Sequence, residues 1–306
     1  MNKHTDYSSC SICPQNCNAN RFIDISSAFC QTSVYPEIAS ICKHTGEEPV
    51  FGGKDGVCNV FFSHCNLQCI YCQNYQISKN TISQKPPMYL EDAVSRIIKI
   101  LDSGISFLGF VSPTHQIKQM VEIIELLHKE NYFPTILYNT NGYEKINTLK
   151  QIEKHIDIYL PDFKYFDNHI AIQYSSAPHY KEITTNAIKE MICQKGIVPK
   201  FDKNGFMRQG VVVRHLILPN HIENSINTLT HINNHFGRNL YISIMAQYFP
   251  TPLVKTHPKL NRTISTDEYD TVVDTIDNLG FFNGWIQDLD NNTQYKPDFE
   301  RENPFL

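Results

Sequence analysis

The sequence predicts an α/β fold, because short apolar runs alternate with amphipathic helical patterns along most of the chain. The apolar runs are nearly continuous, as in strands buried on both faces of a parallel sheet. About six strand–helix units follow one another, too few for a closed eight-stranded barrel. We therefore expect a partial (βα)6 TIM-like barrel, preceded by a cysteine-rich N-terminal extension.

Six segments are expected to form the parallel strands, because each is rich in Val, Ile, Tyr, Phe or Leu. In chain order they are Asn59–Phe62, Phe107–Val111, Thr135–Tyr138, Ile156–Leu160, Val211–Leu218 and Tyr241–Met245. Polar residues lie at or near the end of every segment. Since the carboxyl ends of barrel strands meet on one face, we expect these polar residues to share a single site.

Amphipathic helices are predicted between the strands. Residues 90–101 and 117–127 carry apolar side chains at i, i+3, i+4 and i+7, the stripe of a helix packed on one face. A third helix is predicted to begin after Ser265, which forms a capping box with Glu268, and to end at Gly280. Strand-to-strand connections of this kind are right-handed.

Composition and charge limit the class of protein. The 306 residues are 41% hydrophobic and 19% charged, with a net charge of −4, as in a globular protein. We predict a cysteine-rich extension over residues 1–50 and the barrel over 51–306. No basic run is long enough to follow a phosphate backbone, so nucleic acid is not an expected partner. No signal-peptide pattern or membrane-spanning apolar run is present, which predicts a cytoplasmic protein without membrane contact.

Cysteines give the most specific signal. Nine of the ten lie between Cys10 and Cys72, and in a reducing compartment such clustering indicates metal ligation more than disulfides. Cys65-x3-Cys69-x2-Cys72 follows the first predicted strand, and three thiolates can hold three irons of a 4Fe-4S cluster. A zinc site or unrelated buried thiols are the alternatives. Zinc sites usually pair two half-sites, however, and only the isolated Cys193 follows downstream.

The three-cysteine loop resembles the signature of radical S-adenosylmethionine (radical SAM) enzymes, as does Tyr71 before the last cysteine. The resemblance is closer to the uncharacterised branch of pyruvate formate-lyase activating enzyme homologues, and it covers nearly the whole chain. The stretches that carry it are residues 61–67, Cys72-Gln73-Asn74, 111–115, 138–143, 157–165, 213–216, Leu218-Pro219-Asn220 and 245–248.

This resemblance implies a reaction. The fourth iron would bind the amino and carboxylate groups of S-adenosylmethionine, and one electron would cleave the S–C5′ bond to give methionine and a 5′-deoxyadenosyl radical. That radical would abstract a hydrogen atom from the substrate. An electron donor such as flavodoxin or ferredoxin is implied, as is a glycyl-radical enzyme as the substrate. Radical chemistry on another small molecule or protein remains an alternative.

The resemblance also implies which residues bind the cluster and the cofactor. Cys65, Cys69 and Cys72 would be the cluster ligands. The residues implied or hypothesised to contact S-adenosylmethionine are Tyr71, Ser112, Thr114, Asp162, Lys164, Arg214 and His215. In the activating enzymes the second strand usually ends in Gly-Gly-Glu-Pro, which contacts the methionyl amine. Here the sequence is Ser-Pro-Thr-His, so oxygen atoms of Ser112 or Thr114 are hypothesised to replace those contacts.

Structural roles compete with these cofactor roles. Asp162 and Lys164 would be of little energetic consequence as a surface ion pair. Thr114 is also a suitable N-cap for the helix through Ile117. Arg214 and His215 are adjacent on a strand, so one faces the barrel interior and the other faces outward, and the sequence does not say which.

The N-terminal part holds a second cysteine group, formed by Cys10, Cys13, Cys17 and Cys30. Four thiolates can close a structural zinc site or carry an auxiliary iron–sulfur cluster. Members of the same branch have a cysteine-rich N-terminus of this kind. The alternative is a set of reduced, buried thiols. We therefore predict a second metal site here and leave its metal open.

Two other classes of protein are compatible with the cysteines. A non-catalytic zinc-binding protein would use zinc as scaffolding in both groups and would unfold when the metal is removed. An electron-transfer protein agrees less well, since such proteins generally ligate every iron with a protein thiolate. The sequence identifies neither the substrate nor the oligomeric state.

Overall fold

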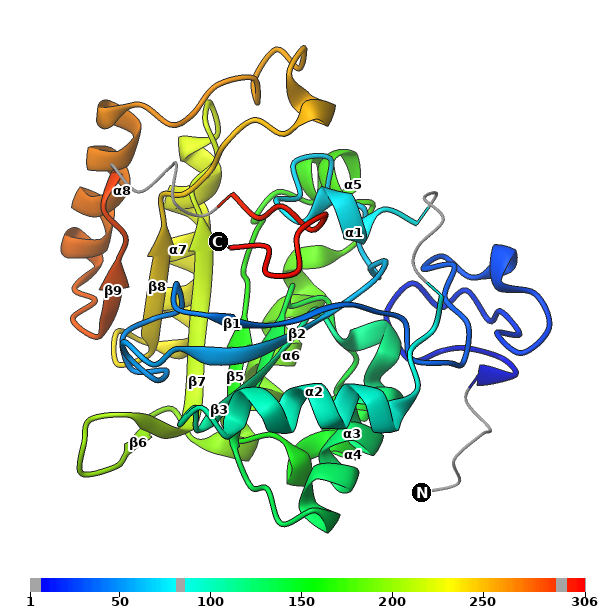
Figure 1. Cartoon of the computed structure of the whole chain (residues 1–306). Coiled ribbons are helices and arrows are strands. Elements are labelled where there is room, and N and C mark those ends of the chain that lie inside the picture. The colour runs from blue at the N-terminus through cyan, green and yellow to red at the C-terminus, as the bar shows by residue number, and fades with distance from the viewer. Residues whose placement is uncertain (1–6, 81–85, 290–295, 306) are drawn as a thin grey trace.

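The computed structural model describes residues 7–80, 86–289 and 296–305 (Figure 1). The strands are β1 (Ile38–His44), β2 (Val57–Phe62), β3 (Phe107–Val111), β4 (Thr135–Thr140), β5 (Ile158–Pro161), β6 (Lys200–Phe201), β7 (Met207–Leu216), β8 (Tyr241–Met245) and β9 (Gly284–Ile286). The α-helices are α1 (Tyr75–Ser78), α2 (Leu90–Leu101), α3 (Ile117–Lys129), α4 (Ile146–Ile152), α5 (Asn168–Ser175), α6 (Tyr180–Lys195), α7 (Ile222–Phe236) and α8 (Thr266–Leu279).

A mostly parallel sheet forms the centre of the molecule, with the strand order β1-β2-β3-β4-β5-β7-β8-β9. Strands β2 to β5 and β7 to β9 run parallel, whereas β1 pairs antiparallel with β2, and the short β6 pairs only with β7. In the described part of the chain β1 and β9 do not pair with each other, so the sheet is not closed. This confirms the predicted partial barrel.

The helices return the chain between parallel strands and cover the outside of the curved sheet (Figure 1). Neighbouring helices pack in pairs, α2 on α3, α4 on α6 and α7 on α8. The predicted capping box is present, since Ser265 accepts from the Glu268 N–H and Glu268 accepts from the Ser265 N–H. Gly280 ends α8 in the left-handed conformation, as expected. None of the described helices has the length and apolar character needed to cross a membrane.

Two predicted strands match β3 and β8 residue for residue, and the other four overlap β2, β4, β5 and β7. Strand β9 was not predicted, because three residues that begin with glycine are too short to give a periodic signal. Strand β1 lies within the predicted N-terminal extension and adds an edge to the sheet. The boundary between residues 50 and 51 stays a prediction.

The two largest groups of buried apolar side chains lie inside the barrel and beneath the helices. The inner layer lies toward the end where the strands begin and consists of Phe51, Val57, Phe107, Leu137, Ile158, Leu160, Met207 and Val212. Alternate residues of the same strands, such as Phe110, Tyr159 and Val213, point outward into the larger core under the helices. Because this inner layer fills the barrel near the beginning of the strands, polar groups occupy the carboxyl ends.

Gly284 lets β9 approach β8 closely. Its φ is +125°, and a Cβ atom there would lie 1.8 Å from the carbonyl oxygen of Ile242. We expect Gly284→Ala to lower the free energy of unfolding by more than about 3 kcal/mol. Backbone strain at such a φ costs about 1–3 kcal/mol, and in addition β9 must move away from β8. Chemical denaturation measures the loss.

Gly237→Ala provides the matched control. Gly237 has φ +77°, and in the described part of the chain no atom other than those of its chain neighbours lies within 4 Å of its Cβ position. This variant should therefore show the backbone strain alone. Equal losses of stability in the two variants would contradict the close approach of β9 to β8.

Candidate iron–sulfur and cofactor site

The loop after β2 carries Cys65, Cys69 and Cys72, and hydrogen bonds to the segment around α1 fix its shape. His64 turns the chain in the left-handed conformation (φ +66°), and its N–H donates to the Ile77 carbonyl (2.6 Å). The Cys65 N–H donates to Asn80 Oδ1 (3.1 Å), and Asn80 Nδ2 donates back to the Cys65 carbonyl (3.1 Å). The backbone of Cys65, the first cysteine, is therefore held in place by the Asn80 side chain.

The end of α5 holds the middle of the same loop. The N–H groups of Gln68 and Ile70 donate to the carbonyls of Ser175 (3.1 Å) and Tyr174 (2.8 Å). These two carbonyls belong to the last turn of α5, where helix carbonyls have no partner within the helix. The N–H groups of the cysteine loop thus bond carbonyl oxygens that have no partner within α5.

Hydrogen-bond donors point at all three sulfur atoms, and at Cys72 these are the Ser78 side chain and the Asn74 backbone. Ser175 Oγ donates to Cys69 Sγ (2.9 Å), and Cys65 Sγ accepts from Asn141 Nδ2 (3.6 Å) and from the Leu67 N–H (3.4 Å). Such donors stabilise sulfur in its anionic, metal-bound form. Three soft ligands supported in this way fit an iron–sulfur cluster.

Cys65 is buried, and Cys69 and Cys72 are half-buried. Burial raises the pKa of all three, that of Cys69 to about 11, and the Lys164 ammonium acts in the opposite direction on each. Within the described residues, no three Cys, His, Asp or Glu side chains are grouped closely enough to hold a metal ion. In a cubane each cysteine binds its own iron, so its ligands need not converge on one point.

Asp162 and Lys164 form an ion pair beside the cysteines, at the end of β5. Only 17% and 14% of their side chains are exposed. Burial lowers the pKa of Lys164, but Asp162 and Cys69 outweigh it, so the pKa lies well above its ordinary value. The hydroxyl of Tyr180 donates to the Asp162 carbonyl (2.9 Å). The interpretation as a surface ion pair is therefore wrong.

Tyr71 is buried, with 4% of its surface exposed, and its hydroxyl hydrogen-bonds the hydroxyl of Tyr165 (2.5 Å). Tyr165 in turn contacts Ser175 Oγ (2.6 Å), which donates to Cys69. The ring of Tyr71 lies 6.1 Å from that of Tyr248. A chain of hydroxyls thus links Tyr71 to a predicted cluster ligand, and its contact with adenine stays a prediction.

Ser112 and Thr114 have different surroundings at the end of β3. Ser112 is partly buried in the left-handed conformation (φ +49°), and its N–H donates to the Asn139 carbonyl (2.7 Å). Thr114 is fully buried, and its hydroxyl donates to Glu144 Oε1 (2.6 Å). The N-cap of α3 is Gln116, so the interpretation of Thr114 as this cap is wrong.

Glu144 is a buried carboxyl that the sequence analysis did not identify. Its Oε1 accepts hydrogen bonds from the hydroxyls of Thr114, Tyr138 (3.1 Å) and Thr140 (2.5 Å), whereas its Oε2 has no partner among the described residues. Burial raises its pKa to about 7, against the three hydrogen bonds. It joins the ends of β3 and β4 behind the cysteine loop.

Arg214 and His215 point in opposite directions from β7. His215 uses both ring nitrogens within the protein, one with the Phe163 carbonyl (2.7 Å) and the other with Ser225 Oγ (2.9 Å) on α7. It therefore lies on the helix side of the sheet, which does not support the predicted contact with the cofactor. Arg214 faces the barrel interior, where it pairs with Glu47 and Glu48.

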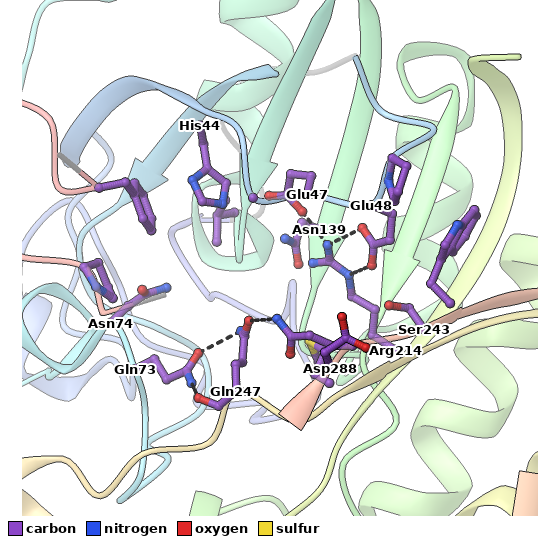
Figure 2. Close-up of a pocket in the computed structure, with 18 of the residues that line it drawn as sticks. His44, Glu47, Glu48, Gln73, Asn74, Asn139, Arg214, Ser243, Gln247 and Asp288 are labelled. Atoms are coloured by element: carbon purple, nitrogen blue, oxygen red, sulfur yellow. Dashed lines mark hydrogen bonds and ion pairs between the residues drawn. The ribbon is translucent and has the colours of Figure 1, made fainter. Parts of the chain in front are cut away.

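A cavity of about 360 Å³ opens between the strand ends (Figure 2). Gln73, directly after Cys72, lies in its wall and joins a chain of amides. Gln73 and Gln247 exchange two hydrogen bonds (2.8 and 3.0 Å), and Gln287 Nε2 donates to Gln247 Oε1 (3.0 Å). The cavity wall is therefore continuous with the cysteine loop, which no sequence pattern indicated.

The N-terminal cysteines are near neighbours of one another. Burial and the neighbouring thiols of Cys30 and Cys10 together raise the pKa of Cys13 to about 12. Cys17 Sγ lies 3.9 Å from the Cys10 carbonyl oxygen. These four cysteines, like the others described, are not grouped closely enough to hold a metal ion. The second metal site stays a prediction.

Comparison with known proteins identifies the family. A sequence model of the radical SAM superfamily matches residues 59–227, more than half of the chain. The chain belongs to the radical SAM superfamily. It is therefore a radical SAM enzyme, with a 4Fe-4S cluster and S-adenosylmethionine as cofactors and a need for an electron donor.

An uncharacterized protein of Methanocaldococcus jannaschii is 25% identical over 277 residues, which cover 88% of this chain and 74% of the relative. Among solved structures, HydG, a maturase of the [FeFe]-hydrogenase, matches with TM-score 0.52 and 15% identity over 74% of this chain and 50% of HydG. Streptococcus suis SuiB bound to S-adenosylmethionine matches with TM-score 0.50 and 10% identity over 75% of this chain and 50% of SuiB.

A third structure, anSMEcpe with bound AdoMet, matches with TM-score 0.50 and 12% identity over 74% of this chain and 61% of that protein. The radical SAM chain described here thus spans about half to three fifths of the length of these structures. At such low identities the likeness shows the fold alone.

We expect the raised pKa of Glu144 to make the protein less stable as pH rises. The carboxyl has a pKa of 4.5 when unfolded and about 7 when folded, so its contribution is complete below about pH 4.5 and is lost through pH 7. The difference corresponds to about 3 kcal/mol. Glu144→Gln keeps an oxygen acceptor but no charge, so it should exceed the wild type in stability at pH 8.5 and match it near pH 5.

Chemical denaturation at the two pH values measures this difference. The exposed Glu153→Gln is the control and should follow the wild type at both. If Glu144→Gln lost stability with pH as steeply as the wild type, Glu144 would not be the group responsible.

Proposed function

We propose that Cys65, Cys69 and Cys72 hold the 4Fe-4S cluster and that hydrogen abstraction takes place in the adjoining cavity. The observation that carries this proposal is the convergence of three hydrogen-bonded cysteines and the buried Asp162–Lys164 pair at one edge of the barrel. When bound, the cluster and S-adenosylmethionine supply a 5′-deoxyadenosyl radical after one-electron cleavage of the cofactor.

The protein's own residues orient and enclose these groups. Lys164 and Asp162 would bind polar groups of the cofactor, as in the activating enzymes that the sequence resembles. Ser112 is better suited than Thr114 to replace the missing Gly-Gly-Glu-Pro contacts, because the Thr114 hydroxyl is committed to Glu144. The buried ring of Tyr71 and the amides that continue from Gln73 would exclude water from the radical.

The finer proposal is that this enzyme activates a glycyl-radical enzyme by abstracting hydrogen from a glycine of that partner. The likeness to pyruvate formate-lyase activating enzyme homologues supports it, and flavodoxin or ferredoxin is the proposed electron donor in the cytoplasm. The second candidate function is radical chemistry on another small molecule or protein. The cavity of about 360 Å³ favours it, since that volume falls in the range of small-molecule sites.

We expect Cys65→Ala, Cys69→Ala and Cys72→Ala each to abolish formation of 5′-deoxyadenosine, since each removes one of three cluster ligands. Chromatography after anaerobic reconstitution, reduction and addition of S-adenosylmethionine measures the product. Cys193→Ala is the control, because this exposed thiol lies on α6, and it should retain activity. Activity that survives any of the three ligand changes would exclude the assigned cluster site.

We also propose that Cys10, Cys13, Cys17 and Cys30 bind a second metal, as zinc or an iron–sulfur cluster. Arg21 supports this, because it is 1% exposed and its partners are neutral: the carbonyls of Thr32, Ser33 and His115, the hydroxyl of Thr32 and the sulfur of Cys10 (4.0 Å). A buried cation is costly without an anion, and metal-bound thiolates would provide one.

Metal analysis tests this second site. Cys13→Ala should remove one site's metal while leaving the cluster signal of Cys65, Cys69 and Cys72 intact. Cys42→Ala is the control, a buried thiol outside the group that should leave the metal content unchanged. Metal content that is the same in Cys13→Ala and the wild type would contradict the proposal.

A further inference from the structure

A triad of buried charges forms part of the cavity wall. Arg214 donates from Nε to Glu48 Oε1 (2.8 Å) and from Nη2 to Glu48 Oε2 (2.6 Å), and the same Nη2 pairs with Glu47. The side chains of Glu47, Glu48 and Arg214 are 9%, 6% and 10% exposed. Figure 2 shows the two glutamates directed at Arg214. Two carboxylates share one guanidinium, so the triad carries an excess of negative charge.

The sheet holds Glu47 in its charged form. Burial raises the pKa of this carboxyl, but Arg214 and the hydrogen bond from Asn59 outweigh it and help to lower the pKa to about 2. Asn59 Nδ2 donates to Glu47 Oε1 (2.9 Å). Gly109 leaves the space for this amide, since a Cβ atom there would lie 2.0 Å from Asn59 Oδ1. Asn59 on β2 and Gly109 on β3 thus stabilise the charged form of Glu47.

His44 does not neutralise that charge. Burial lowers the pKa of its imidazole, and Glu47 only partly opposes the effect, so the ring is neutral at physiological pH. His44 lines the cavity, is 9% exposed and lies against the ring of Phe305 (4.0 Å between centroids). Its Nδ1 is buried without a hydrogen-bond partner among the described residues. The cavity is therefore lined by His44, whose Nδ1 has no partner, as well as by the excess carboxylate.

Among the described residues, the rest of the cavity wall supplies no further cation. Its charged residues are Glu47, Glu48, Arg214 and Asp288, and its other polar residues are neutral, among them Asn139, Ser243 and the three glutamines. Uncompensated negative charge in a buried cavity is costly and favours a positively charged occupant. Asp288 and one carboxylate of the triad remain without a cationic counterpart in this wall.

We propose that the substrate of this cavity carries a cationic nitrogen, as an alkylammonium or guanidinium group, directed at Glu47 and Glu48. Its carbon chain would extend toward Gln73 and the cysteine loop. This inference rests on the proposed function of the cavity and adds the substrate class to it. The triad lies on the β1–β2 connection and β7. Arg214 is a backbone neighbour of Asp162, but its side chain pairs with Glu47 and Glu48, whereas Asp162 pairs with Lys164.

Binding of matched probes tests the proposal. Anaerobic calorimetry on the reconstituted enzyme with S-adenosylmethionine present would compare n-butylguanidinium, n-butylammonium and n-butyrate. We expect at least one of the cations to bind and butyrate not to bind. Glu47→Gln, which removes one charge but keeps the acceptor for Asn59, should weaken the binding of the cation at least tenfold and the binding of S-adenosylmethionine far less. The exposed Glu130→Gln is the control and should change neither.

Each outcome decides the inference. Equal binding of butyrate and the cations, or no binding of either cation, would overturn it. An equal loss of S-adenosylmethionine and cation binding in Glu47→Gln would also overturn it, because the charge would then serve the cofactor. If Glu47→Gln does not fold, Glu48→Gln and the wild-type preference among the probes decide. Glu47-dependent cation binding without any 5′-deoxyadenosine formation would refute the proposed function and leave this inference standing.

Discussion

The contact between the cysteine loop and the last turn of α5 is the one on which the site depends. Ser175 acts twice there, since its carbonyl accepts from the Gln68 N–H and its hydroxyl donates to Cys69 Sγ. Helix ends leave carbonyls unpaired, and an irregular loop needs acceptors for its N–H groups, so each satisfies the other. These hydrogen bonds fix the middle of the three-cysteine loop against α5.

Two separate groups of charged side chains lie inside the barrel. Asp162 and Lys164 lie beside the cysteines, whereas Arg214 lies between the two glutamates of the β1–β2 connection. The backbones of Asp162 and Arg214 form a bridge between β5 and β7, so the two groups sit at one level of the sheet but face different neighbours. In our proposal, the Asp162–Lys164 pair serves the cofactor and the excess negative charge beside Arg214 serves the substrate.

Much of this arrangement was predictable from the sequence, because parallel strands place their carboxyl ends on one face and buried strands have a strong apolar signal. The cysteine spacing identified the superfamily in the same way. The contributions of Ser175 and Glu144 were not predictable, since they depend on helix and loop packing between distant segments. The direction of His215 was also open, because alternation along a strand fixes opposite faces without saying which is inside. Strand β9 was too short to detect.

In the proposed site, a cluster held by Cys65, Cys69 and Cys72 leaves one iron free to bind S-adenosylmethionine. Electron–nuclear double resonance on the reduced, reconstituted protein tests it directly, using cofactor labelled with nitrogen-15 in the methionyl amine. The account predicts a hyperfine coupling from the labelled nitrogen that disappears when any of the three cysteines is replaced. A cluster signal without that coupling, or a single zinc ion bound at the loop, would contradict it.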